Sequence, residues 1–316
     1  MLYLNLGSED PYFNLAAEEY LLKMRNEDFL VLYIDSPSVI TGKHQVAQRE
    51  ADMRFVYENN IPVIRRISGG GTVFHDEGNL NFSFITRSEK GKQVDFRKYT
   101  APVIEFLKDQ GVTAFFEGKN DLRVNGLKIS GNAEHVYRER VLHHGTLLFS
   151  TNIDNIRGSL RSDTGNYSGR AVSSNPSPVM NLDKIMENIK NIYELKDRMA
   201  DFFMSGGTIT DEFKPGFYEL NEIKSLSDSK YRTWEWNYAY GPEYQFNNNF
   251  ILKGAPCHCS LSVKSGVIAE CKTEGTDEIV RVSGLLTGCR HKVEDMLDVL
   301  KSADIMTDDS EVFNFI

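Results

Sequence analysis

Cysteine is scarce in this chain, and the first 256 residues contain none. The four cysteines are Cys257, Cys259, Cys271 and Cys289. This excludes a disulfide-dense scaffold, and it excludes a cysteine nucleophile from any site that the first 256 residues build. Together with His258 and His291 the late cysteines suggest a zinc site, but Cys-x-Cys is not the spacing of a standard zinc finger. We therefore expect small buried thiols, which is what scattered intracellular cysteines usually are.

Long hydrophobic runs and a surplus of positive charge are also absent. The longest apolar candidates, such as 29–34, are strand-sized, whereas a membrane span needs about 18 or more residues. Lys and Arg number 36 against 45 Asp and Glu, giving a net charge of −9, which argues against a dedicated nucleic-acid binder. The first twenty residues contain no Lys or Arg, unlike a leader peptide. We expect a cytoplasmic protein that binds neither nucleic acid nor membrane, although a local basic pocket for a small anion is compatible with these counts.

The length of 316 residues, with 41% apolar and 26% charged residues, suits one large globular domain plus a small one. The aromatic and polar stretch 231–249 has no clear period, and we place the domain boundary near its end. The expected domains are therefore residues 1–248 and 249–316. In the second domain we expect a few short strands followed by a helix near 293–301.

Short apolar runs between turn residues predict a succession of strands and helices. We expect strands at 29–34, 61–64, 80–85 and 141–149, and helices capped at Asn14, over 95–110 and from Leu182. Residues 157–181 are rich in Gly, Ser, Asn and Pro, which is typical of a long loop that serves a site.

The pair Asn125-Gly126 between two short apolar runs predicts a β-hairpin with a type I′ turn. On its return strand Leu127 and Ile129 share one face, and Lys128 lies on the other. The hairpin would therefore hold Lys128 on a rigid support. Most strand lysines are simply solvated, and that alternative stands at this point.

A run of three glycines, Gly69 to Gly71, follows two arginines and precedes a polar stretch. We expect both arginines at the rim of the run, where their charge and fork geometry suit a phosphate or a carboxylate. Consecutive glycines let backbone N–H groups converge on an anion without obstruction by Cβ atoms. The run is no Walker loop, because no Gly-Lys-Ser/Thr follows, and it is no dinucleotide fingerprint, because the residues after it favour a strand. A mobile turn with arginines on a solvated face is the alternative. We favour a ligand site, since His75, Asp76, Asn79 and Asn81 continue the polar stretch beside apolar strands.

Three motifs, taken together and in this order, resemble the signature of lipoate-protein ligases. They are Arg66-Ile-Ser-Gly-Gly-Gly-Thr-Val-Phe-His-Asp-Glu-Gly-Asn-Leu-Asn81, Asn120-Asp-Leu-Arg-Val-Asn-Gly-Leu-Lys-Ile-Ser-Gly131 and His143-His-Gly-Thr-Leu-Leu148. The resemblance covers about residues 1–250, and the remainder resembles the small accessory domain of the family more weakly. It implies an α/β (α+β) fold of the biotin and lipoate ligase superfamily, a mixed β-sheet packed with helices, followed by a small α+β domain.

The resemblance also implies an activity and a set of site residues. Such enzymes condense lipoate with ATP and Mg²⁺ to lipoyl-AMP, and then transfer the lipoyl group to a lysine of lipoyl domains. The acceptors are E2 subunits of 2-oxoacid dehydrogenases and the glycine cleavage H protein. By similarity the catalytic residue is Lys128. The residues implied in ATP binding are Arg66, Gly71, Thr72, Val73, Phe74, Asp121 and Lys128, and those implied in lipoate binding are Ser68, Gly69, Gly70, Lys128 and His144. No metal beyond the Mg²⁺ of ATP is implied.

Several alternatives remain open from the sequence. Asp121 would face the nucleotide or metal, or merely cap the hairpin, and His144 would donate to the acyl carbonyl or be a structurally satisfied buried histidine. An octanoyl or lipoyl transferase would need a thiolate near Lys128. A biotin ligase and a non-catalytic lipoyl-domain binding protein are further alternatives. In the loop 161–181, Pro176 and Pro178 replace polar residues that relatives carry, so how this loop closes over the adenylate is open.

Overall fold

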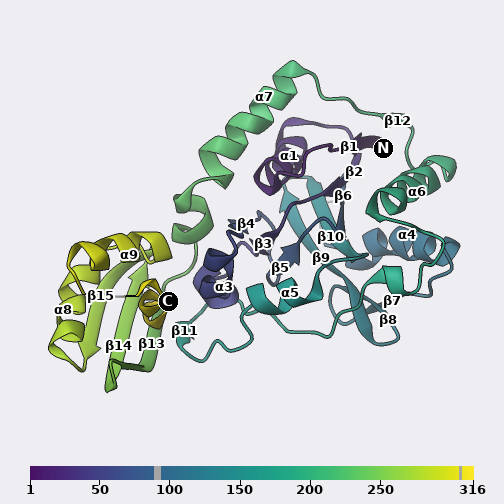
Figure 1. Ribbon diagram of the computed structural model, residues 1–316. Helices are drawn as coiled ribbons and strands as arrows, with labels where there is room; N and C mark the ends of the chain where they lie inside the picture. Colours follow the sequence, from purple (N-terminus) through teal and green to yellow (C-terminus); the bar gives the residue numbers. More distant parts are fainter. Residues whose placement is uncertain (89–93, 306–307) are drawn as a thin grey trace.

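The computed structural model describes residues 1–88, 94–305 and 308–316. The described chain is built around one eight-stranded sheet (Figure 1). Its strands, in the order in which they lie side by side, are β12 (Asp211–Glu212), β1 (Leu2–Asn5), β2 (Phe29–Ile34), β6 (Asn79–Arg87), β10 (Arg140–Leu148), β9 (Leu127–Tyr137), β8 (Asp121–Val124) and β7 (Phe115–Glu117). The strand β1 pairs in parallel with β2 and β12, and the other neighbours are antiparallel. The expected mixed sheet is confirmed.

Helices cover both faces of this sheet. The strand β2 is buried along its whole length, because alternate side chains enter two different cores. Its odd-numbered residues pack against α1 (Pro11–Met24), and its even-numbered residues pack into the core that contains α4 (Phe96–Asp109) and α6 (Ile192–Ser205). This explains why a central strand of a mixed sheet is an unbroken apolar run in the sequence.

A smaller, three-stranded sheet carries the glycine run. It consists of β3 (Ser38–Thr41) between β4 (Val63–Arg65) and β5 (Val73–His75), and the glycines form the connection from β4 to β5. Two short helices, α2 (Ala47–Glu50) and α3 (Met53–Glu58), follow β3. After β10 come α5 (Ile153–Ser159) and the long loop predicted to serve a site, interrupted by β11 (Tyr167–Gly169) and a short 3₁₀ turn, η1 (Leu182–Lys184).

The C-terminal part is a separate layer of strands and helices (Figure 1). The helix α7 (Phe217–Leu226) and two helical turns, η2 (Ser227–Tyr231) and η3 (Glu235–Ala239), lead into it. Its elements are β13 (Tyr244–Leu252), β14 (Ala255–Lys264), β15 (Val267–Glu274), α8 (Asp277–Leu286), α9 (Val293–Ser302) and the 3₁₀ helix η4 (Asp309–Phe315). The strand β11 pairs with β13, and one continuous core joins this part to the three-stranded sheet. The boundary expected at 248/249 falls inside β13, and the division into two domains stays a prediction.

Two helix assignments made from the sequence are wrong. The cap of α1 is Asp10, which accepts the Tyr12 N–H, and Pro11 takes the first helical position, where its missing N–H costs nothing. Asn14 lies inside the helix and donates instead to Asp35 (2.8 Å). The helix expected from Leu182 begins only at Ile192, after the cap Asn191. The apolar spacing before it marks buried loop residues rather than a helix face.

The hairpin and the helix α4 match the sequence prediction. Asn125 and Gly126 have φ of 51° and 78°, as a type I′ turn requires. The helix α4 starts after Asp95, which caps it, and Gly111 follows with φ of 85°. In the described chain no helix is long and apolar enough to cross a membrane.

Three of the four late cysteines are small core residues, and Cys289 is only partly buried. Cys257, Cys259 and Cys271 are buried, and burial raises the pKa of Cys271 to about 11. Within the described ranges no cluster of three His, Cys, Asp or Glu side chains is arranged to hold a metal ion.

His291 lies at the junction of the C-terminal part with the rest of the chain. Its Nδ1 accepts the Tyr244 hydroxyl, its Nε2 donates to the carbonyl of Phe315, and its own carbonyl accepts from Gln48. Burial lowers the pKa of His291 from 6.5 to about 4, because a buried imidazolium would have no carboxylate partner here.

This depressed pKa predicts acid sensitivity of the folded state. Between pH 6.5 and about 4, His291 is protonated in the unfolded chain but neutral in the folded protein. The contribution of the neutral, buried His291 to the free energy of unfolding is therefore complete above pH 6.5 and is lost as the pH falls. The free energy of unfolding then falls by at most about 1.4 kcal/mol for each pH unit. Between pH 7.5 and 5.0 the unfolding temperature of the parent protein should drop by more than that of His291→Gln, whose side-chain amide still donates and accepts a hydrogen bond. Equal drops would contradict this role of His291. The other histidines with lowered pKa, His135 and His143, are present in both proteins and cancel.

Candidate active site

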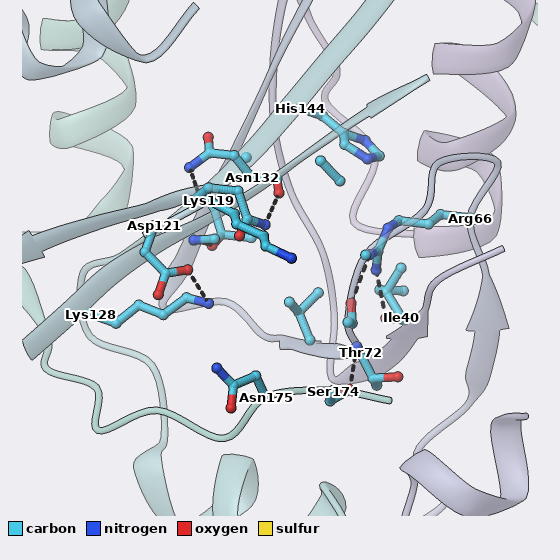
Figure 2. A pocket seen from close by; sticks show the side chains of 18 of the residues that line it. Ile40, Arg66, Thr72, Lys119, Asp121, Lys128, Asn132, His144, Ser174 and Asn175 are labelled. Carbon is cyan, nitrogen blue, oxygen red and sulfur yellow. Dashed lines mark hydrogen bonds and ion pairs between the residues drawn. The ribbon is translucent and has the colours of Figure 1, made fainter. Parts of the chain in front are cut away.

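A cavity of about 530 Å³ lies between the glycine run and the β8–β9 hairpin. Gly70 to Val73 form one wall, and Asp121 and Lys128 form the facing wall (Figure 2). The strand β10 contributes His144 and its neighbours between them. Two segments about sixty residues apart in the sequence therefore meet in one pocket, as the resemblance requires.

The ammonium of Lys128 is held at the cavity by Asp121. Their Nζ and Oδ1 atoms are 2.8 Å apart, and the other carboxylate oxygen pairs with Arg123, also at 2.8 Å. The Lys128 side chain lies across the backbone of Gly131, where an added Cβ would be 3.2 Å from Nζ. The hairpin thus supplies an oriented, partly exposed cation with a carboxylate beside it. Asp121 contacts Lys128 directly rather than only capping the turn.

Arg66 shapes the glycine run from behind. Its guanidinium is buried and donates to the carbonyls of Gly69 (2.6 Å), Gly71 (2.7 Å) and Ile40 (3.0 Å). Gly70 between them has φ of 87°, a conformation that favours glycine. Burial lowers the pKa of Arg66 to about 10, so the group is still a cation at neutral pH. Its donors thereby fix the course of the backbone through the turn.

Arg65 does not lie at the rim of the site, contrary to the interpretation of both arginines as rim charges. It is fully buried and donates to the carbonyls of Gly42 (3.0 Å), Gln45 (2.7 Å) and Asn237 (2.8 Å). Arg65 is the last residue of β4 and Arg66 follows it, so the two side chains point to opposite sides of the extended chain. Arg65 therefore ties η3 to the loop 42–45 beneath the glycine run.

A buried chain of hydrogen bonds leads from α1 to the glycine run. The carboxylate of Glu18 accepts from His144 Nδ1 (2.9 Å), and His144 Nε2 lies 2.6 Å from the hydroxyl oxygen of Ser68. Ser68 also accepts from Arg66 Nε (2.9 Å), so its own proton points to His144. Burial alone would raise the pKa of Glu18, but His144 and the hydroxyls of Ser83 and Tyr33 hold it below its usual value. Both ring nitrogens of His144 are thus engaged, and its ring faces the cavity.

The loop after β11 closes one side of the cavity. The hydroxyl of Ser174 accepts the Thr72 N–H (2.9 Å) and donates to the buried carboxylate of Glu50. Further along, the carbonyl of Pro178 accepts the backbone N–H of Lys128 (2.9 Å), and the Met180 N–H donates to the backbone carbonyl of Lys128 (3.0 Å). The loop is therefore attached to both walls, by its backbone, by Ser174 and by Ser177, which accepts from Arg123 (2.6 Å).

The predicted site residues fall into two groups. Those that line the cavity are Arg66, Gly70, Gly71, Thr72, Val73, Asp121, Lys128 and His144. Ser68 and Gly69 lie behind it and contact Arg66, and the ring of Phe74 packs into the core shared with the C-terminal part. Any contact of Phe74 with a nucleotide would have to use its main chain.

Sequence reasoning missed the apolar end of the cavity and several of its polar groups. Leu15, Tyr33 and Ile40 line the apolar end, and no motif marks them. The polar groups that were missed include Lys119, Asn120, Asn132 and Asn175. Asn120 stands at the start of the second motif, which was a usable signal. An elongated, partly apolar acid could place its chain at the first end and its carboxylate near Lys128.

Residues 10–204 match the family model described as the lipoyl protein ligase A/B catalytic domain. The chain is 34% identical to lipoate–protein ligase 1 of Staphylococcus aureus, over 95% of this chain and 93% of that protein. It is 33% identical to lipoate-protein ligase LplJ of Bacillus subtilis, over 96% of this chain and 95% of that protein.

Solved structures with the same fold include ligand complexes. Protein Ta0514 of T. acidophilum with bound lipoic acid superposes with a TM-score of 0.65 at 26% identity, over 75% of this chain and 98% of that one. A lipoate-protein ligase A bound with ATP superposes with a TM-score of 0.64 at 26% identity, over 75% of this chain and 97% of that one. A bi-partite lipoate protein ligase from Thermoplasma acidophilum, described with its E2 lipoyl domain, superposes with a TM-score of 0.65 at 26% identity, over 75% of this chain and 95% of that one. P. falciparum LipL1 shares the fold over 98% of this chain and 96% of its own, at 21% identity and a TM-score of 0.64.

Proposed function

Since the chain belongs to the lipoate-protein ligase family, we propose that it condenses lipoate with ATP and transfers the lipoyl group to a lysine of an acceptor protein. In the first step a carboxylate oxygen of lipoate attacks the α-phosphorus of ATP, and the bond to the β-phosphate breaks. Lipoyl-AMP forms and pyrophosphate leaves. In the second step the acceptor amine attacks the lipoyl carbonyl, AMP leaves, and the amine loses a proton.

The observation that carries the proposal is the shape and charge of the cavity between the glycine run and the β8–β9 hairpin. Its apolar end at Leu15, Tyr33 and Ile40 suits the hydrocarbon chain and ring of lipoate, and Lys128 faces the glycine run at the polar end. Joining two anions requires fixed positive charge and donors more than it requires a nucleophile. Holding both reactants in line can supply roughly 7–11 kcal/mol of the barrier.

In this proposal Lys128 contacts both reacting groups. Its ammonium would lie between the lipoyl carboxylate and the α-phosphate, where it offsets their repulsion and the charge that develops on phosphorus. In the transfer step the same ammonium would polarise the acyl carbonyl. Arg66 acts indirectly, since its donors already hold the carbonyls of Gly69 and Gly71 and thereby aim the turn at the phosphates. The closed loop around Ser174 would exclude water from the mixed anhydride.

Mg²⁺ fits the donor set of the cavity. Asp121 supplies a carboxylate among the lining residues, and Mg²⁺ takes most of its ligands from phosphates and water when it binds with a nucleotide. Asp121 would therefore hold the ion, which supplies charge compensation to the phosphates. The E2 lipoyl domains and the glycine cleavage H protein are the proposed acceptors, and the cytoplasmic location expected from the sequence belongs to the same proposal.

The cavity argues against the thioester alternative. No cysteine is among the residues that line it, and Cys257 and Cys259 are buried in the C-terminal part. An acyl transferase that forms a thioester needs a thiolate beside the lysine.

The test is a lipoate-dependent exchange of labelled pyrophosphate into ATP, with octanoate and biotin in parallel reactions. We expect exchange with lipoate and a gain of one lipoyl group on a lipoyl domain by mass spectrometry. Exchange with biotin alone would favour a biotin ligase. The absence of exchange with all three acids would favour a non-catalytic lipoyl-domain binding protein.

A further inference from the structure

We propose that Lys119 binds the phosphates of ATP that leave as pyrophosphate, an inference that rests on the proposed function. Lys119 lies at the turn between β7 and β8, and its ammonium points into the cavity (Figure 2). No motif that the sequence singled out includes this residue.

The other cations of the cavity are already engaged. Four Lys and Arg side chains line it: Arg66, Lys119, Arg123 and Lys128. Arg123 and Lys128 share the carboxylate of Asp121, and Arg66 donates to backbone carbonyls and to Ser68. Across residues 1–88, 94–305 and 308–316, Lys119 makes no ion pair and its ammonium donates no hydrogen bond. It is therefore the lining cation whose full charge is free for a ligand.

The loop that closes one side of the cavity carries no cation into it. The part of this loop that lines the cavity, residues 172–175, contains no Lys or Arg, and the nearby Arg170 is exposed and does not line the cavity. The loop thus supplies hydroxyl and amide groups but no cation. A triphosphate carries several negative charges, so any side-chain cation that adds to the charge of the Mg²⁺ ion has to come from the opposite wall, where Lys119 lies.

The backbone around Lys119 is fixed although the side chain of Lys119 is free. The neighbouring Asn120 accepts from the N–H and from the side-chain amide of Asn132, both at 3.0 Å, and donates back to the Asn132 carbonyl. Gly118, with φ of 65°, forms the turn on the other side. The turn is therefore attached to β9 close to Gly131 and Lys128. A lysine carried on this support can meet a phosphate with little loss of backbone freedom.

The position of Lys119 favours phosphate over the other anions of the reaction. The lipoyl carboxylate is assigned to Lys128, and its apolar chain to the opposite end at Leu15 and Tyr33. Lys119 is exposed, so it lies where the outer phosphates would approach solvent and where pyrophosphate would leave. Acidic groups of an acceptor protein are the competing ligand, and the two half-reactions distinguish them.

The experiment measures both half-reactions in Lys119→Ala, in Lys119→Arg and in a matched control. The control is Lys108→Ala, an exposed lysine on α4 that does not line the cavity. In pyrophosphate exchange we expect a rise of about 10-fold or more in the KM for ATP of Lys119→Ala, since a charge-assisted contact is worth roughly that much. The KM for lipoate should stay near the parent value, Lys119→Arg should keep most of the ATP affinity, and Lys108→Ala should match the parent.

The second arm supplies purified lipoyl-adenylate and acceptor, so that no pyrophosphate takes part. Lys119→Ala should then transfer at the parent rate with an unchanged KM for the acceptor. An unchanged KM for ATP would overturn the inference, and so would a raised KM for the acceptor in this arm, which would assign Lys119 to docking. If the parent protein itself showed no lipoate-dependent exchange, the proposed function would fail, and that result is distinct from either outcome for Lys119.

Discussion

Lys128→Ala should lower the rate of lipoate-dependent pyrophosphate exchange by about 10²–10³-fold or more while the protein stays folded. The ammonium is the cation that faces the glycine run from the hairpin, and its removal leaves the carboxylate of Asp121 facing two incoming anions. The side chain is 22% exposed and packs against Gly131 rather than into a core, so thermal unfolding should change by only a few degrees. The transfer step from purified lipoyl-adenylate should be impaired as well, because the same charge polarises the acyl carbonyl.

Two companion variants separate the charge of Lys128 from its position. Lys128→Arg keeps the charge but replaces a compact ammonium with a planar fork, so we expect activity well below the parent protein. Lys128→Met keeps most of the side-chain volume but removes the charge, and Asp121 stays paired with Arg123. If packing of the side chain rather than its charge were required, Lys128→Met would keep near-normal activity. A folded Lys128→Ala protein with near-normal exchange would contradict the catalytic role itself.

Local sequence patterns predicted the parts of the site that depend on short-range geometry. Asn125-Gly126 specifies a hairpin by backbone conformation alone, and that fixes which face of the return strand carries Lys128. The glycine run could likewise be recognised as a turn that admits an anion. That these two segments meet in one cavity followed from the resemblance, because no rule of spacing relates residues so far apart.

The features that were mispredicted or missed depend on tertiary contacts. Arg65 and Arg66 are adjacent and chemically identical, but their side chains point in opposite directions. Arg65 donates to the loop 42–45, and Arg66 donates to the glycine run. Glu18 belongs to none of the three motifs, and it can be buried because His144 and the hydroxyls of Tyr33 and Ser83 satisfy its carboxylate. The spacing from Leu182 looked helical because buried loop residues can fall at helical intervals by chance.

The C-terminal boundary shows the same limitation. The stretch 231–249 lacks a period because it contains the last residue of the π-helical turn η2, the whole of the π-helical turn η3 and the first part of β13. Pairing of β13 with β11, a three-residue strand from the closing loop, decides where this sheet begins. A pairing between segments about eighty residues apart leaves no mark on either segment alone.

Gly42→Ala should lower kcat/KM for ATP by roughly 10²-fold, although Gly42 belongs to none of the recognised motifs. An added Cβ would lie 2.1 Å from the carbonyl oxygen of Gly70 and 3.1 Å from Oε1 of Gln45. Real Cβ contacts essentially never fall below 3.0 Å, so the glycine run would have to move by about 1 Å. The carbonyl of Gly42 also accepts from Arg65 (3.0 Å), which holds the loop in place and prevents it from yielding instead.

The matched control for Gly42→Ala is Gly69→Ala, a substitution within the glycine run itself. An added Cβ at Gly69 would meet nothing within 4 Å, and neither glycine has a positive φ, so intrinsic backbone strain does not distinguish the two variants. We expect Gly69→Ala to stay within a few-fold of the parent protein, and Gly42→Ala to lose about 1–3 kcal/mol of stability through overpacking as well. Thermal unfolding, together with the KM for ATP and the KM for lipoate, checks both. If the two variants had equal activity, the position of the glycine run would not govern ATP binding, and Lys128 with Lys119 would have to account for it alone.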